Sequence, residues 1–430
     1  MKILASLVLL TTVSCYGQTY TSYFTGNTTD LDTNGQGGIC MMGGASEQDD
    51  AMIWFLERAN GGDVLVLRAS GSDGYNDYMF TDLGVTLNSV ETIVCNSAAA
   101  SDEAYVQQAV QEAEAIWFAG GDQWDYISYW RETAIDTLIN ENLANGGLVI
   151  GGTSAGMAIQ GGYYFSAENG TVTSAQALSN PYQNNITVDN TPFLNNPILA
   201  DVITDTHYDN PDRKGRHVTF MARMIESSPF FAKGIACNEY VAVCIDENGI
   251  AKVYGEYPAY EEYCYFIQVN CDNADTGLEP ETMQAATNLE WNRQESALIV
   301  YKVPGTLTAN NSFDLNDWKT GNGGEWQRWW VEDGVLMEDT GVAPDCSASL
   351  SENSFVLTAF PNPTSRYLNI NSSELLTEYM IYDLSGKIIL TDEIYLNNLH
   401  IDLNTVEPGQ YILEVENESQ EKSRLRFNKL

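Results

Sequence analysis

The chain has 430 residues, and 59 acidic against 20 basic side chains give it a net charge of −39. Its length exceeds that of one ordinary domain, and a hydrophobic fraction of 44% is enough for a globular core, so we expect two domains. The charge excludes nucleic acid as a partner, because too few basic groups are present to neutralise a phosphate backbone. It suits a secreted protein and would attract cationic substrates, although solvation of a large surface is the favoured interpretation.

The first 17 residues are predicted to be a secretory signal peptide. Lys2 precedes a short apolar run, which is followed by small and polar residues, and cleavage would leave Gln18 at the new terminus. A lipid attached at Cys15 is the competing interpretation, and Thr12 counts against it. The apolar run is too short to span a bilayer, and no later segment is apolar enough, so we predict no transmembrane segment.

Export makes disulfides possible, and an odd number of cysteines remains after the signal peptide is removed. Cys264 and Cys271 are close enough in sequence to close a small loop. Cys40 and Cys237 lie in apolar runs and are interpreted as buried thiols. No Cys or His spacing is typical of a zinc site, so we expect neither a metal nor a cofactor.

From residue 37 onward, short apolar strands alternate with helical segments. This alternation predicts an α/β fold with a parallel sheet and helices on both faces. The glycine turns at residues 120–121 and 151–156 both follow strands, and the carboxyl ends of parallel strands meet at one edge. We therefore expect them to share a crevice. The tryptophan-rich residues 290–345 are interpreted as an outer part of the same domain.

The C-terminal part of the chain has a different character. Residues 346–354 are small and polar and are interpreted as a linker. Residues 355–430 carry short strands separated by turns, which predicts a small all-β sandwich. With the signal peptide at 1–17, this leaves residues 18–345 as the domain that carries the chemistry.

Ser154 lies in the pattern Gly-x-Ser-x-Gly, between a predicted strand and a predicted helix. Small neighbours allow such a serine to occupy a strained turn, and the free amides of the following helix can hold a developing oxyanion. A packing role for Ser154 is the less favoured alternative. The pattern therefore predicts a nucleophile.

A serine nucleophile needs a base, and the chain has three histidines. His400 lies in the C-terminal domain and is interpreted as structural, while His217 opens a helix and is interpreted as a surface or packing residue. His207 follows a strand and would lie on the same edge as Ser154. We therefore expect His207 to be the base.

A third group must orient the histidine. Asp205 is too close in sequence to reach the far ring nitrogen, and the acids at residues 246–247 belong to a predicted hairpin turn. Glu239 follows a strand-like run and is the preferred acid. The resulting order Ser, His, Glu disfavours an α/β-hydrolase, in which the acid precedes the histidine.

Together these residues resemble the serine peptidase family that contains cyanophycinase and dipeptidase E. The resemblance covers roughly residues 37–255. It implies a parallel sheet flanked by helices, similar to class I glutamine amidotransferases, and a triad of Ser154, His207 and Glu239. It is carried by "MMGGASE" at 41–47, "FAGGDQ" at 118–123, "GGTSAGMA" at 151–158 and "DTHYDNPDRKGRH" at 205–217.

The resemblance also implies residues around the triad. Gln123, Asp205, Arg213 and Arg216 become candidate substrate-binding residues, and the amides of Gly121 and Ala155 become a candidate oxyanion hole. The two arginines could clamp a substrate carboxylate or pair with local acids, and neither alternative is preferred. Pro211, Thr206 and residues 237–240 depart from the family's usual residues, which leaves the triad intact and alters the pocket.

The C-terminal domain resembles the type IX secretion sorting domain. The resemblance is carried by "AFPNPTSRYLNI", "IYDLSGKII", "VEPGQYILEV" and the basic end "KSRLRFNKL". It implies export by the type IX machinery, and a mature protein that is secreted or attached to the cell surface.

We therefore expect a secreted, cyanophycinase-like serine exopeptidase or hydrolase that cuts amide bonds through an acyl-enzyme. Its substrate would be a peptide or polymer, and cyanophycin, a polyaspartate with arginine on its side chains, is a candidate. Two alternatives remain: a non-catalytic surface binding protein on a degenerate peptidase fold, and an esterase with the same triad.

Overall fold

A computed structural model describes residues 18–227, 231–345, 357–360, 364, 366–383, 387–419 and 422–429. The predicted signal peptide and the linker at 346–354 lie outside these residues. The chain divides into two compact units, Met1–Pro344 and Asp345–Leu430. Each unit is described by itself below.

A ten-stranded mixed sheet forms the first layer of the larger unit. Its centre is parallel, as predicted, because the four neighbouring pairs among five strands all run in the same direction. In spatial order these strands are β4 (Ser89–Cys95), β3 (Asp63–Arg68), β5 (Ala115–Phe118), β6 (Val149–Thr153) and β2 (Gly38–Met42).

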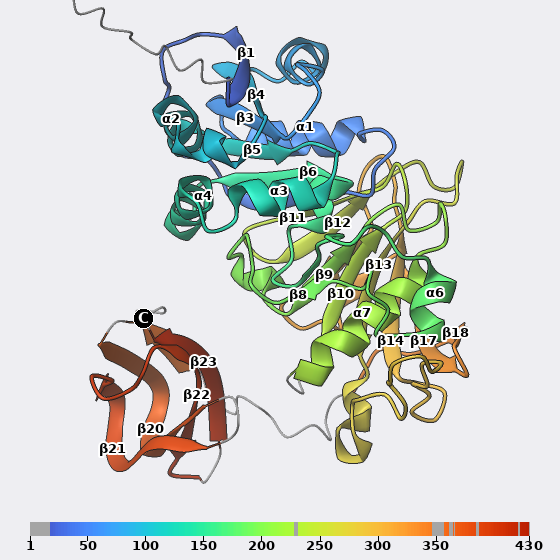
Figure 1. Cartoon of the computed structure of the whole chain (residues 1–430), viewed down its shortest axis with the longest axis vertical. Helices are drawn as coiled ribbons and strands as arrows, with labels where there is room; N and C mark the ends of the chain where they lie inside the picture. Colours follow the sequence, from blue (N-terminus) through green and yellow to red (C-terminus); the bar gives the residue numbers. More distant parts are fainter. Residues whose placement is uncertain are drawn as a thin grey trace, which may run out of the picture. The chain divides into compact units, whose positions relative to one another are not determined.

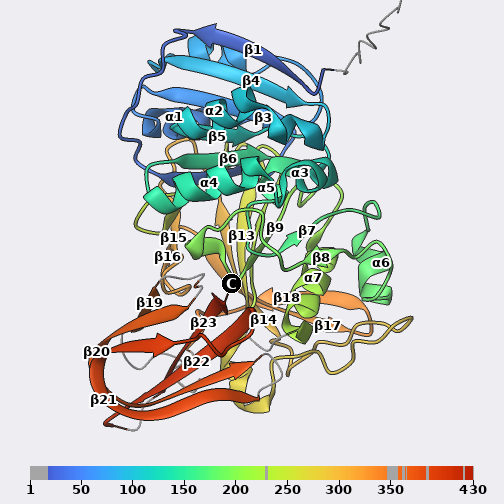
Figure 2. The ribbon, with the colours of Figure 1, turned by 60° about the vertical axis from the view of Figure 1, so that its left-hand side comes forward.

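Antiparallel strands extend this parallel centre on both sides. The strand β1 (Tyr20–Gly26) pairs with β4, and Figure 2 shows β1, β4, β3, β5 and β6 stacked in that order. On the other side the order continues through β11 (Ala242–Ile245), β12 (Ile250–Tyr254), β15 (Ser312–Asp314) and β16 (Gly321–Asn322). The turn between β11 and β12 contains residues 246–249, so the predicted hairpin is confirmed.

Helices cover both faces of this sheet, because successive strand side chains point to opposite sides. Val64 and Val66 of β3 belong to the apolar cluster that includes α1 (Asp49–Arg58). Leu65 and Leu67 belong to the cluster that includes α2 (Ala104–Glu112), α3 (Gln123–Trp130) and α4 (Ala134–Asn145). Figure 1 shows α2 and α4 side by side on this face. The predicted α/β layering is therefore confirmed.

A second, six-stranded sheet was not foreseen as a separate layer. Its order is β18 (Val335–Thr340), β17 (Glu325–Glu332), β14 (Leu298–Pro304), β13 (Tyr263–Val269), β10 (Lys233–Cys237) and β9 (Val202–Asp205). Only the pair of β9 and β10 is parallel among these strands. Residues 290–344 lie in the larger unit. Their strands β14, β17 and β18 form the antiparallel edge of the six-stranded sheet, while β15 and β16 extend the ten-stranded one.

One long helix and several short elements complete the larger unit. The helix α7 (Lys214–Ser227) packs on the six-stranded sheet, and its apolar residues share a cluster with β10, β13 and β14. The remaining elements are α5 (Ala155–Ala158), α6 (Ser174–Ser179), the paired strands β7 (Tyr164–Phe165) and β8 (Val188–Asp189), and the helical turns η1 (Tyr78–Asp82), η2 (Ala98–Asp102), η3 (Pro197–Leu199) and η4 (Cys271–Thr276).

The smaller unit is all-β, as predicted. Its strands are β19 (Leu357–Phe360), β20 (Tyr367–Asp383), β21 (Ile388–Asp402), β22 (Gly409–Asn417) and β23 (Lys422–Lys429). They form one five-stranded sheet that curls around an apolar core, as Figure 2 shows for β20 and β21. The strand β20 is longer than the short strands expected, and it has register shifts against β21 after Asn371, after Leu376 and after Ile381.

The cysteines divide between buried thiols and a disulfide. Cys40 and Cys237 are free and buried, as predicted. Cys264 is also a free, buried thiol, whereas Cys271 is disulfide-bonded, so the suggested loop between these two is wrong. The reason is geometric: Cys264 points into the core beside Cys237 on the neighbouring strand. None of the helices in the described part of the chain is long and apolar enough to cross a membrane.

We predict that residues 18–345 fold without the C-terminal unit, because each unit has its own apolar core. The truncated chain should unfold cooperatively, at a temperature within a few degrees of the first transition of the full mature chain. Differential scanning calorimetry of both proteins checks this. A truncated chain without a cooperative transition would contradict it.

Candidate active site

Ser154 occupies the turn between β6 and α5 in a strained backbone conformation. Its φ is 52° and its ψ is −114°, a region that residues with a Cβ rarely adopt. Its amide donates a hydrogen bond of 3.0 Å to the carbonyl oxygen of Met42 on β2. The flanking glycines permit the turn, since a Cβ on Gly156 would lie 2.1 Å from the carbonyl oxygen of Phe118. The turn therefore presents the serine at the carboxyl end of the parallel strands.

His207 approaches Ser154 from the other sheet. It follows β9 with a φ of 48°, and its amide donates a hydrogen bond of 2.8 Å to the carbonyl oxygen of Gly43. Its Nε2 lies 2.8 Å from Ser154 Oγ. The imidazole packs directly on Gly44, where a Cβ would lie 2.4 Å from Cε1 of the ring. Gly44 therefore provides the space that the histidine occupies.

Glu239 lies on the far side of the imidazole, just after β10. Its Oε1 is 2.6 Å from His207 Nδ1, and its Oε2 accepts a hydrogen bond of 3.1 Å from Asn210. Its amide donates a hydrogen bond of 2.9 Å to the carboxylate of Asp209. The hydrogen bond from His207, together with that from Asn210, lowers the pKa of Glu239 against the opposing effect of burial. Glu239 therefore stays ionised at neutral pH.

The structure thus brings together the three residues selected from the sequence. With Nδ1 of His207 protonated and donating to Glu239, Nε2 is free to accept the proton of the Ser154 hydroxyl. A hydroxyl, an imidazole and a carboxylate in such a chain can activate the hydroxyl as a nucleophile. Asn210 and Asp209, which orient the glutamate, were not among the site residues expected from the sequence.

A cavity of about 390 Å³ opens over Ser154 and His207. Besides these two residues, its walls include Glu47, Arg68 and Tyr75, which the sequence analysis did not select. Arg68 is the last residue of β3, at the carboxyl edge of the parallel strands. Ligands bind at this edge in α/β sheets, so the position of Arg68 at the end of a predicted strand could have indicated it. Its guanidinium donates hydrogen bonds to the carbonyl oxygens of residues 70 and 72. Arg68 brings a positive charge to the cavity.

The predicted oxyanion hole lies on the turn after β5 and at the start of α5. A Cβ placed on Gly120 would lie 3.7 Å from that of Ser154, so the turn approaches the serine closely. The hydroxyl of Tyr126 fixes this turn by donating to the carbonyl oxygens of Ala119 and Gly120, at 2.9 and 3.1 Å. Within the described residues, no acceptor is recorded for the amides of Gly121 and Ala155. Both amides remain candidates for holding an oxyanion.

The predicted pocket residues Asp205 and Arg216 contact each other. Both are buried, and the guanidinium donates hydrogen bonds of 2.5 and 2.9 Å to the two carboxylate oxygens. Burial raises the pKa of Asp205, but the charge of Arg216 outweighs it and holds the pKa below its usual value. This geometry fits the structural pairing that the sequence analysis left open for Arg216. Because both side chains are buried and bond each other, few of their hydrogen-bonding groups are available to a substrate.

Arg213 and Gln123 are more accessible than this buried pair. Arg213 is half-buried and donates a hydrogen bond of 3.1 Å to the carbonyl oxygen of Thr206, beside His207. Burial and the charge of Arg216 both lower the pKa of Arg213. Gln123, the first residue of α3, donates a long hydrogen bond of 3.4 Å to the carbonyl oxygen of Phe165. Both residues remain candidates for contacting a substrate.

The other two histidines lie away from this arrangement. His217 is fully buried, so it is a packing residue, and burial lowers its pKa to about 4. His400 lies in the smaller unit, where it bonds Asn369 and stacks on Tyr367. No group of three or more Asp, Glu, His or Cys side chains among the described residues is placed to hold a metal ion.

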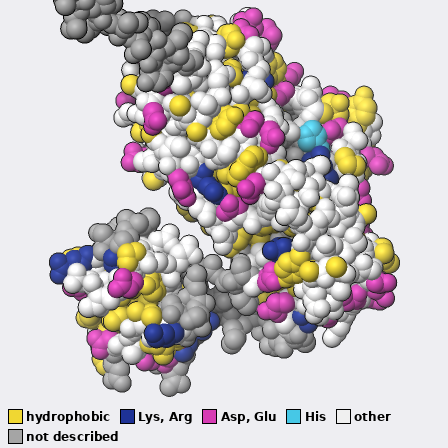
Figure 3. Space-filling model, in the orientation of Figure 1, with side chains coloured by type: hydrophobic (Ala, Val, Ile, Leu, Met, Phe, Trp, Pro, Cys, Tyr) yellow, Lys and Arg dark blue, Asp and Glu magenta, His cyan; other side chains and the backbone are white. Residues whose placement is uncertain are grey.

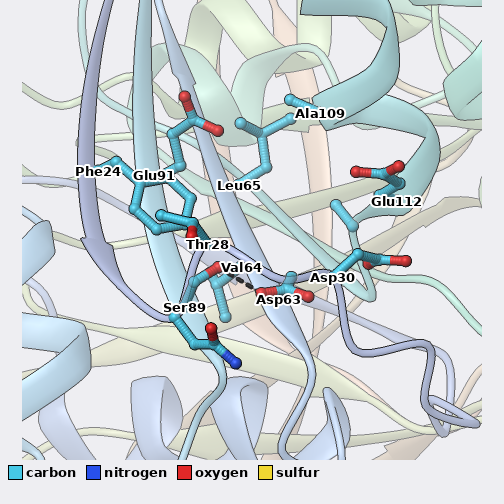
Figure 4. A pocket seen from close by; sticks show the side chains of 12 residues that line it. Phe24, Thr28, Asp30, Asp63, Val64, Leu65, Ser89, Glu91, Ala109 and Glu112 are labelled. Atoms are coloured by element: carbon cyan, nitrogen blue, oxygen red, sulfur yellow. Dashed lines mark hydrogen bonds between the residues drawn. The ribbon is translucent and has the colours of Figure 1, made fainter. Parts of the chain in front are cut away.

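A second hollow, drawn in Figure 4, shares no lining residue with the Ser154 cavity. It measures only about 70 Å³ and lies between β1, β3, β4 and α2. Its walls carry Asp30, Asp63, Glu91 and Glu112. Acidic side chains are also scattered over the face of the molecule that Figure 3 shows. We assign no role in the chemistry to this hollow.

Parts of this chain are similar to known proteins. Residues 69–253 match Peptidase family S51, and residues 358–426 match the Secretion system C-terminal sorting domain. A cyanophycinase from Synechococcus elongatus is 24% identical over 238 residues, covering 53% of this chain and 68% of that protein. A cyanophycinase from Trichormus variabilis is 22% identical over 178 residues, covering 41% and 54%. A peptidase structure from an acI-B1 Actinobacterium has a TM-score of 0.37 at 14% identity, covering 52% and 89%.

We predict that Gly44→Ala displaces the imidazole of His207, because the new Cβ would overlap the ring and Gly44 has a φ of 112°. A crystal structure of the variant should show the Ser154–His207 separation beyond hydrogen-bonding distance, about 3.5 Å. Gly74→Ala is the matched control, since nothing lies within 4 Å of a Cβ there. An unmoved imidazole in the Gly44 variant would contradict the packing argument.

We predict that Asp205→Asn destabilises the larger unit by about 3–5 kcal/mol, because it leaves the Arg216 charge buried and unpaired. Asp201→Asn, which breaks a more exposed pair with Lys233, should cost less than about 1 kcal/mol. Since the folded-state pKa of Asp205 is lowered, its contribution is present above about pH 4 and is lost as the pH falls. Urea unfolding of both variants and the wild type across pH measures the free energies of unfolding. Equal losses of stability in the two variants would refute the prediction.

Proposed function

We propose that this chain, which carries a peptidase family S51 domain and a secretion system C-terminal sorting domain, is a secreted serine peptidase. Its reaction would be the hydrolysis of an amide bond through an acyl-enzyme. The observation that carries the proposal is the hydrogen-bonded chain from Ser154 Oγ through His207 to Glu239, with separations of 2.8 and 2.6 Å. The strained turn at Ser154 and the adjoining cavity support it.

In the first half of the reaction, His207 Nε2 takes the proton of the Ser154 hydroxyl as Oγ attacks the amide carbonyl carbon. Ionised Glu239 stabilises the imidazolium that forms and holds the ring in position. The imidazolium then gives its proton to the leaving nitrogen as the carbon–nitrogen bond breaks. An ester between Ser154 and the acyl half of the substrate remains.

In the second half, His207 takes a proton from water, and the resulting hydroxide attacks the ester carbonyl. The ester bond breaks, Ser154 recovers its proton from the imidazolium, and the acid product leaves. The amides of Gly121 and Ala155 would donate to the oxyanion in both halves, because they lie on the turn beside the serine and at the start of the following helix. Besides the substrate and water, these steps use only groups of the protein.

For the substrate we propose a peptide or polymer, with cyanophycin as the first candidate to test. The support comes from the curated cyanophycinases that this chain resembles. Arg68, which lines the cavity, and Arg213, which bonds the carbonyl oxygen beside His207, would meet a carboxylate of such a substrate, since Arg216 is paired with Asp205. Exopeptidase action is part of this proposal and rests on the same resemblance.

Two alternatives use the same fold. A surface binding protein would not need the hydrogen-bonded chain at Ser154, and labelling of Ser154 by a fluorophosphonate would argue against it. An esterase would use the same nucleophile on a more reactive acyl group, and comparison of matched amide and ester substrates separates the two. The intact chain of hydrogen bonds favours a hydrolase over the binding protein.

The sorting domain bears on where the reaction occurs. It marks this chain for secretion, and we propose that the type IX machinery exports it after removal of a signal peptide at residues 1–17. The mature protein would then meet its substrate outside the cell or on its surface.

We predict that the mature chain releases β-aspartyl-arginine from purified cyanophycin, and that Ser154→Ala abolishes this release because no nucleophile remains. Ser179→Ala, which removes an exposed hydroxyl bonded only within its own helix, is the control and should stay active. Chromatographic detection of the dipeptide measures the reaction. Release that survives in the Ser154 variant would refute the proposed nucleophile, and no release by the wild type would exclude cyanophycin as the substrate.

A further inference from the structure

Two buried cysteines face each other across neighbouring strands of the ten-stranded sheet. Cys40 on β2 lies directly opposite Cys244 on β11, and the two strands are antiparallel. Both thiols are free, and the two residues are only 0% and 1% exposed. The Sγ of Cys244 lies 3.5 Å from the Sγ of Cys40, to which it donates a hydrogen bond. An approach of roughly 1.5 Å would bring the two sulfur atoms to the length of a disulfide bond.

The backbone at this position also suits a disulfide. The amide of Gly43 donates a hydrogen bond of 2.9 Å to the carbonyl oxygen of Val241, which makes these two residues a hydrogen-bonded pair. Hydrogen-bonded and non-hydrogen-bonded pairs alternate along an antiparallel ladder, so Cys40 and Cys244, three positions farther along, form a non-hydrogen-bonded pair. The Cα atoms of such pairs are about 4.5 Å apart, within the range of about 4.4–6.8 Å found for disulfide-bonded cysteines. The strands therefore need little rearrangement for a bond to form.

Two further observations indicate that the chain folds under oxidising conditions. Cys271 is disulfide-bonded, so the folded chain already contains one such bond. The sorting domain at residues 358–426 marks the chain for secretion, and disulfides form and persist in exported proteins. A facing pair of cysteines in this chain therefore meets the conditions under which thiols are oxidised.

The other free cysteines of the described chain do not compete for this pairing. Cys237 and Cys264 lie opposite each other on β10 and β13 of the six-stranded sheet. Cys95 lies on β4, which three other strands separate from β2 in the ten-stranded sheet. Among the described residues, Cys40 is therefore the cysteine placed to bond Cys244.

We propose that Cys40 and Cys244 form a disulfide bond in the exported protein, by thiol–disulfide exchange with an external disulfide oxidant. The thiolate of one cysteine attacks a sulfur of the oxidant and releases one of its thiols, which leaves a mixed disulfide. The thiolate of the other cysteine then attacks this mixed disulfide, so the protein bond forms and the oxidant leaves as a dithiol. The two cysteines together lose two protons and two electrons, which the oxidant gains. Because both sulfurs are buried in the folded chain, the exchange takes place during folding, before β11 joins β2.

The bond links two strands that adjoin the candidate active site. The strand β2 leads into Gly43, whose carbonyl oxygen accepts a hydrogen bond from the amide of His207, and β11 begins three residues after Glu239. The bond closes a loop of roughly 200 residues, and closing a long loop restricts the unfolded chain strongly. It therefore stabilises the strands that hold the histidine and the glutamate. This inference goes beyond the proposed function and stands whether or not Ser154 is a nucleophile.

Disulfide mapping of the full chain after export into an oxidising periplasm tests the bond directly. Free thiols are blocked with N-ethylmaleimide in denaturant, and the chain is then cut with a protease specific for glutamate. Cleavage after Glu47 and Glu239 places Cys40 and Cys244 in separate peptides and also separates Cys244 from Cys237. Mass spectrometry should find the Cys40 and Cys244 peptides linked, and reduction should separate them. Both cysteines blocked as free thiols, or Cys244 linked to a different cysteine, would overturn the proposal.

Thermal unfolding with a matched control measures what the bond contributes. The exported chain should unfold at least roughly 5 °C above the same chain made in a reducing cytoplasm. The disulfide of Cys271 also contributes to this difference, so variants are compared, each with its own reduced form. Cys40→Ala with Cys244→Ala should lose most of the difference, whereas Cys95→Ala, which removes another buried free thiol, should keep it. A difference that survives in full in the double variant would overturn the proposal.

Discussion

Hydrogen bonds to the backbone at Gly43 and Gly44 hold the candidate active site together. The carbonyl oxygen of Gly43 accepts from the amide of His207, that of Gly44 accepts from the amide of Tyr240, and the amide of Gly43 donates to Val241. A Cβ on Gly43 would lie 2.0 Å from the carbonyl oxygen of Asn238, so the two backbones are in direct contact. These contacts join the end of β2 to the segments that carry the histidine and the glutamate. The distances between the three reacting groups depend on them.

This junction matters because the site spans two sheets. Ser154 follows a strand of the ten-stranded sheet, while His207 and Glu239 follow β9 and β10 of the six-stranded sheet. Between residues 238 and 241 the chain passes from one sheet to the other, and it carries Glu239 at this crossing. A change in the packing of the sheets would therefore move the base relative to the nucleophile. The buried pair of Asp205 and Arg216 joins the end of β9, which leads into His207, to α7.

The few basic residues have distinct positions in this acidic chain. Arg216 is held by Asp205 in the interior, Arg68 lines the cavity at the serine, and the larger hollow that shares Glu47 with this cavity is lined by no basic side chain. The cavity at Ser154 therefore contains one carboxylate and one guanidinium, Glu47 and Arg68.

The α/β layering, the all-β C-terminal unit and the meeting of Ser154, His207 and Glu239 could all be predicted from the amino-acid sequence. The prediction is possible because apolar periodicity fixes the strands, and because small residues are needed wherever the chain turns sharply after a strand. The meeting of two sheets at the site, the free thiol of Cys264, and the positions of Arg68, Asn210 and Glu47 around the triad emerge from the folded chain alone. Pairing between distant strands and the facing of side chains across a gap depend on how the layers pack, and local sequence patterns do not encode that packing directly.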